Sequence, residues 1–112
     1  MDIDVQSRSD VQLITVRGRL HMGEPFDQLS AAMNELLNAG HSRFLLDLHE
    51  VPVVDSSGIG LLVRFLTSAK QRRGSLKLLN PSQFVVQTLT MVRVITLFEV
   101  FDDAQLAVAS FS

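Results

Sequence analysis

Apolar residues recur along this chain in short blocks whose spacing switches between the period of a strand and the period of a helix. Ile3 and Val5 alternate with polar residues, and the run 11–16 is rich in β-branched residues, so both segments are predicted strands. The polar residues 7–10 between them are typical of a turn, which indicates a hairpin. Gly18 ends the second predicted strand.

The next block has helical spacing. Pro25 suits the first turn of a helix, and Gly40 is a stop signal. Between them, apolar residues recur every three or four positions, which predicts one buried helix face: Phe26, Leu29, Met33, Leu36 and Leu37. The nearly continuous apolar run 44–48 then predicts a strand covered on both faces.

A second helix is predicted after the segment Asp55-Ser56-Ser57-Gly58, ending at about Arg73 before Gly74. Its expected buried face again follows helical spacing: Ile59, Leu62, Phe65, Leu66 and Ala69. Residues 75–79 are the next predicted strand.

The last third of the chain predicts two more helices and one more strand. Asn80 is a favourable cap and Pro81 a favourable first residue for a third helix. Residues 92–97 fit helix, turn or strand. Residues 98–101 are predicted to form the last strand, and Asp102 or Asp103 to cap a closing helix that runs through residue 109.

The predicted order, with strands and helices alternating after the hairpin, implies right-handed crossovers and a mostly parallel sheet. We therefore predict an α/β fold in which one mixed β-sheet of about five strands is flanked by about four helices. A chain of 112 residues without a linker or repeat is expected to form a single domain over residues 1–112.

Composition narrows the classes of function. Cysteine is absent and the net charge is only −2, so we expect no disulfide, no thiolate metal site and no nucleic-acid partner. No apolar run is long enough to cross a bilayer, and the acidic N-terminus lacks the order of a secretory signal. A cytoplasmic protein without membrane insertion is expected. The methionines at 22, 33 and 91 are expected to fill gaps in the core.

The segment Asp55-Ser56-Ser57-Gly58-Ile59-Gly60 is the unusual stretch, because it lies between a strand and a helix, where backbone N–H groups lack partners. One interpretation is structural: Asp55 caps the helix, the serines are solvated, and the glycines allow tight packing. The other is functional: a serine hydroxyl is phosphorylated near the positive end of the helix, an environment that accepts anions.

The segment from Asp47-Leu48 through Val54-Asp55-Ser56-Ser57-Gly58-Ile59-Gly60-Leu61-Leu62 resembles the STAS (sulfate transporter and anti-sigma factor antagonist) family, in its bacterial anti-sigma factor antagonist type. The resemblance extends over nearly the whole chain, through Gly18-Arg19-Leu20 and Leu97-Phe98-Glu99-Val100-Phe101-Asp102. Two positions depart from the family pattern. His21 stands where an acidic residue is usual, and Arg93 stands where glycine is usual.

The resemblance implies a partner switch without catalysis or a cofactor. The unphosphorylated protein is expected to bind an anti-sigma factor that has serine kinase activity. Phosphorylation of Ser56 is expected to end that binding, and a serine phosphatase is expected to restore it. The expected partner-binding residues are His21, Asp55, Ser56, Ser57, Gly58 and Ile59. The alternative within the family is an interaction module unrelated to sigma factors, in a stress-sensing assembly or a lipid-transport complex.

Two other site types are disfavoured by the residues present. A nucleophilic Ser56 would need a base, the Gly-x-Ser-x-Gly elbow is missing, and an enzyme is therefore not expected. The spacings of His21, His41 and His49 match no common metal site, so no metal is expected either.

Overall fold

The computed structural model describes residues 2–112 as one five-stranded sheet with four α-helices, so the predicted fold class is confirmed. The strands lie in sequence order. β1 (Asp2–Arg8) pairs with β2 (Val11–Arg17) in antiparallel fashion, and β3 (Arg43–Glu50), β4 (Ser75–Leu79) and β5 (Val100–Phe101) follow in parallel. The predicted hairpin turn shrinks to Ser9 and Asp10, which both have positive φ angles of 49° and 69°.

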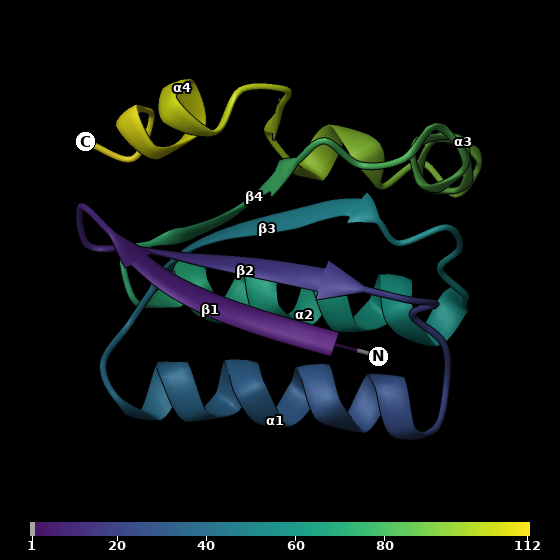
Figure 1. Cartoon of the computed structure of the whole chain (residues 1–112), viewed down its shortest axis with the longest axis horizontal. Coiled ribbons are helices and arrows are strands. Elements are labelled where there is room, and N and C mark those ends of the chain that lie inside the picture. Colours follow the sequence, from purple (N-terminus) through teal and green to yellow (C-terminus); the bar gives the residue numbers. More distant parts are fainter. Residues whose placement is uncertain (1) are drawn as a thin grey trace.

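Helices cover both faces of the sheet. Figure 1 shows α1 (Glu24–Asn38) and α2 (Ser56–Gln71) along one face and α4 (Ala104–Ala109) over the other, with α3 (Gln83–Met91) near the end where β3 finishes. The larger core lies under α1 and α2, and the sequence-predicted positions Leu29, Met33 and Phe65 are buried in it. A smaller core beneath α4 contains Val11, Leu45 and Ala107.

Most predicted boundaries are close to those observed. Gly40 follows α1 with a φ of 96°, and Gly74 follows α2. Asp103, one of the two predicted caps, accepts the Leu106 N–H at 2.9 Å at the start of α4. The segment 92–97, for which three structures were open, forms a turn and a short 3₁₀ helix, η1 (Ile95–Leu97).

The predicted start of the third helix is wrong by two residues. Asn80 has a positive φ of 48° and Pro81 precedes the helix, so neither plays the predicted part. Ser82 is the cap: its hydroxyl accepts the Val85 N–H at 3.3 Å and donates to the Val51 carbonyl at 2.9 Å. The second bond fixes α3 to the loop after β3, which explains why Ser82 rather than Asn80 begins the helix.

Candidate functional site

Two loops from different parts of the chain are joined at the carboxyl end of the sheet. Leu20 and Val54 form an isolated parallel bridge beyond the ends of β2 and β3. The Leu20 N–H donates to the Val53 carbonyl, and the Asp55 N–H donates to the Leu20 carbonyl, each at 3.1 Å. The bridge therefore holds His21, the residue after Leu20, beside the start of α2.

Asp55 is the cap of α2, as the structural interpretation predicted, and it also ties down the His21 loop. One carboxylate oxygen accepts the Gly58 N–H at 2.9 Å, and the other accepts the Met22 N–H at 3.0 Å. Partial burial raises the pKa of Asp55. The N–H groups of Gly58, Met22 and Ser57, with His21 nearby, outweigh it and lower the pKa below its ordinary value. Asp55 is therefore ionised at neutral pH.

Ser56 is the first residue of α2, and its side chain is exposed. The neighbouring Ser57 is half-buried. The first turn of a helix carries free N–H groups and the positive end of the helix dipole. The Ser56 hydroxyl thus lies in solvent at a position that favours a negative group, with the Asp55 carboxylate already committed to backbone donors.

His21 is exposed on the other loop of the site. Its Nδ1 lies 2.9 Å from the Met22 carbonyl oxygen. Because a carbonyl oxygen only accepts hydrogen bonds, Nδ1 carries a proton. Three of the predicted residues, His21, Asp55 and Ser56, are therefore brought to one surface by the Leu20–Val54 bridge.

The glycines of the segment have different roles. Gly58 is buried, and a Cβ there would lie 2.6 Å from Val54 Cγ2 and 2.9 Å from Leu20 Cγ. Its predicted contact with a partner has no exposed surface on which to form, and packing within the domain explains the glycine. Gly60 is exposed, and a Cβ there would meet nothing within 4 Å. Ile59 is half-buried against the larger core.

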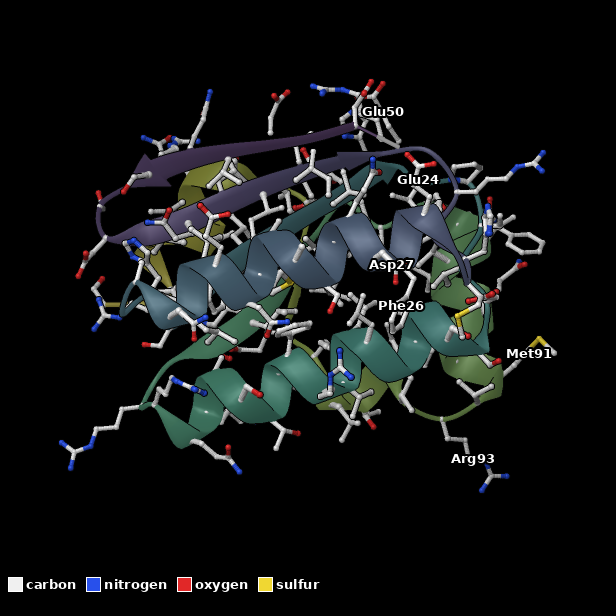
Figure 2. The ribbon with its side chains drawn as sticks, turned by 90° about the horizontal axis from the view of Figure 1, so that it is seen from below. Glu24, Phe26, Asp27, Glu50, Met91 and Arg93 are labelled. Carbon is white, nitrogen blue, oxygen red and sulfur yellow. The ribbon has the colours of Figure 1, made fainter. Side chains whose placement is uncertain are left out.

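Sequence reasoning missed two apolar side chains at this end of the molecule. Met33 fills the core as expected, but Met22 is 62% exposed and Met91 is 82% exposed. Figure 2 shows Met91 and Arg93 at the same end as the acidic residues Glu24 and Asp27. Methionine carries no sequence signal that separates a core position from an exposed one, so only the fold distinguishes them.

The described residues contain neither a cluster of metal ligands nor a helix that could span a membrane. No group of three or more His, Asp or Glu side chains within residues 2–112 could hold a metal ion. Over the same residues, every helix is too short or too polar to cross a membrane.

Residues 2–107 match the model of the STAS domain family. The chain belongs to this family.

A protein of Thermotoga neapolitana, provisionally named an anti-sigma factor antagonist, is 29% identical over 69 residues. That match spans 62% of this chain and 61% of the relative's length.

Solved structures share the fold over nearly the full length. A Thermotoga maritima protein with the same provisional name has a TM-score of 0.90 at 22% identity, covering 97% of this chain and 93% of its own. The Bacillus cell fate determinant SpoIIAA in its phosphorylated form has a TM-score of 0.78 at 17% identity, covering 99% of this chain and 100% of its own.

Proposed function

We propose that this protein is an anti-sigma factor antagonist that is switched by phosphorylation of Ser56. In this proposal the unmodified protein binds an anti-sigma factor with serine kinase activity, and the phosphorylated protein is released until a serine phosphatase acts. The protein works by binding rather than by catalysis. The observation that carries the proposal is the exposed side chain of Ser56 at the first position of α2.

The relatives support the proposal without extending it to a particular partner. The curated relative is named for anti-sigma factor antagonism, and a protein of the same fold has been solved in a phosphorylated form. The exposed Met22 and Met91 offer apolar area for a partner near the serine, because methionine side chains adapt to irregular surfaces.

Electrostatics makes the modification an effective switch. A phosphate adds about −1.5 to −2 charges at the site. One like-charge contact at 4 Å costs roughly 4 kcal/mol at an effective dielectric near 20. Because about 1.4 kcal/mol changes affinity tenfold, a partly screened contact is enough to release a partner with an acidic docking surface. No change of fold is needed.

The test uses the full chain, ATP and the kinase that copurifies with it. Intact mass should show one added phosphate on the wild type and on Ser57→Ala, and none on Ser56→Ala. Ser57 is the matched control because it is the next residue of the same helix turn. Ser56→Asp should lose partner binding while Ser56→Ala keeps it. Modification of Ser56→Ala, or equal partner affinity of the Ser56→Asp and Ser56→Ala variants, would reject the switch.

His21 gives a second test of the same site. The resemblance places an acidic residue at this position in the family, and the structure places His21 beside Asp55. His21→Asp is therefore expected to raise the rate of Ser56 phosphorylation. An unchanged rate, with Ser56 still the modified residue, would show that His21 does not limit the kinase.

A further inference from the structure

The lysines and arginines of this chain gather at the end of the molecule opposite Ser56. Six of the ten line three hollows that all include Arg43. In Figure 1 this end is at the left, where the β1–β2 turn, the carboxyl end of α2 and the C-terminus lie. The six are Arg8, Arg43, Lys70, Arg72, Arg73 and Lys77.

The start of β3, where Arg43 lies, and the turn after α2, where Arg73 lies, are fixed against each other. The Ser75 N–H donates to the Ser42 carbonyl at 2.9 Å. Gly74 approaches the same carbonyl so closely that a Cβ would lie 1.7 Å from its oxygen. The backbone that carries the two arginines is thus held in place, which lowers the entropy lost when they bind a ligand.

Arg73 has a φ of 63°, in the left-handed region that favours glycine or asparagine. A left-handed residue is common just after a helix, and here the Arg73 N–H donates to the Lys70 carbonyl and the Gly74 N–H to the Ala69 carbonyl. The turn places Arg73 directly before Gly74, at the edge of the hollow beside Arg43.

One hollow of about 320 Å³ is lined by Arg43, Lys70, Arg73 and Lys77. Lys77 is fully engaged: its Nζ donates to the Ser110 carbonyl at 3.1 Å and the Ser110 hydroxyl at 2.8 Å, and it pairs with Glu99 at 3.0 Å. Arg43, Lys70 and Arg73 have no carboxylate of residues 2–112 within 4.0 Å. Three cations therefore remain free to bind an anion.

We propose that this hollow, lined by Arg43, Lys70, Arg73 and Lys77, binds a ligand with closely spaced phosphate groups. Arginine guanidinium groups hold phosphate oxygens in pairs, and a lysine adds a mobile point charge. The hollow has room for a pyrophosphate group and carries an excess of positive charge even after Glu99 neutralises Lys77. This site is separate from Ser56 and does not depend on the anti-sigma proposal.

The test is calorimetric titration of the full chain with inorganic pyrophosphate at low ionic strength. Arg73→Gln should weaken binding about tenfold, as expected for loss of a charged hydrogen-bonding group. Arg93→Gln is the matched control, because Arg93 is also exposed, has a φ of 62°, and lies at the Ser56 end. Lys70→Gln should weaken binding as well, and thermal unfolding would verify that each variant is folded.

Separate arms distinguish the source of the phosphate. Phosphatidylcholine vesicles containing phosphatidic acid should be bound, in competition with pyrophosphate, if the natural ligand is a lipid headgroup, and ignored if it is a free phosphate compound. Three results would overturn the site: no pyrophosphate binding by the wild type, equal weakening by Arg93→Gln, or tighter binding of polyglutamate, which would assign the hollow to an acidic protein segment.

Discussion

Replacing either glycine of α2 by alanine tests whether the glycines serve packing or helix flexibility. At Gly60 the added methyl group meets nothing within 4 Å. Alanine is the better helix former by about 1 kcal/mol, so Gly60→Ala should stabilise the protein by about 0.5–1 kcal/mol. At Gly58 the same methyl group enters the space between the two loops of the site.

The size of the Gly58 effect follows from three contacts. The new Cβ would lie 2.6 Å from Val54 Cγ2, 2.9 Å from Leu20 Cγ and 3.0 Å from the Leu20 carbonyl oxygen. The last atom is backbone and belongs to the hydrogen bond that Asp55 donates to Leu20, so it cannot move cheaply. Overpacking of this kind costs about 1–3 kcal/mol. Gly58→Ala should therefore be less stable than Gly60→Ala by about 1–3 kcal/mol.

Urea unfolding of the two variants and the wild type measures this difference directly, provided that the slope of the transition is the same in all three. In thermal unfolding it corresponds to roughly 4 °C per kcal/mol for a domain of this size. Equal stability of Gly58→Ala and Gly60→Ala would refute the packing explanation and restore a functional one for Gly58.

Three further predictions concern charge and backbone strain. Asp55→Ala removes the cap of α2 and should lower the free energy of unfolding by about 1–2 kcal/mol. The native pKa of Asp55 is lowered from its ordinary 3.8. The stability that Asp55 contributes should therefore be present above pH 3.8 and disappear as the pH falls through the native pKa. A hydrogen bond to Asp47 at 2.8 Å raises the pKa of His49 above its ordinary 6.5. The stability from this pair should therefore be complete below pH 6.5 and decline as the pH rises through the native pKa. Thermal unfolding of His49→Gln at several pH values should lack that decline. Arg93 has a φ of 62°, which glycine adopts more easily than other residues. Arg93→Gly should therefore raise the free energy of unfolding by up to about 1 kcal/mol, and Arg93→Ala should not. A gain in stability with alanine would show that the backbone angle is not the cause.

Local sequence signals predicted the helices and strands well, because each of these elements carries its own pattern of apolar spacing and capping residues. The periodicity of Leu29 and Met33 identifies a helix face without knowledge of the rest of the fold, and Asp55 caps its helix through a donor three residues away. The third helix shows the limit of this reasoning. Asn80 is as good a cap as Ser82 by propensity, and the choice is made by the Val51 carbonyl, which lies far away in the sequence.

The motif of the candidate site can be found in the sequence, but the geometry of the site cannot. The motif indicates Ser56, but nothing local shows that the loop after Leu20 lies against the loop after Val53, or that Asp55 serves both. Gly58 was ambiguous for the same reason, since its neighbours come from another strand. The glycine expected at position 93 left a physical trace, because the arginine found there adopts the backbone angle that glycine favours.

The bridge between Leu20 and Val54 has a consequence for the speed and cost of recognition. It continues the hydrogen bonding of the sheet into both loops, so the amide hydrogens of Leu20 and Asp55 should exchange with solvent about as slowly as those of the strands. A docking protein then meets a preformed surface and loses little freedom in ordering it. In the switch proposed for Ser56, one added phosphate ester would then act on a surface that is already formed.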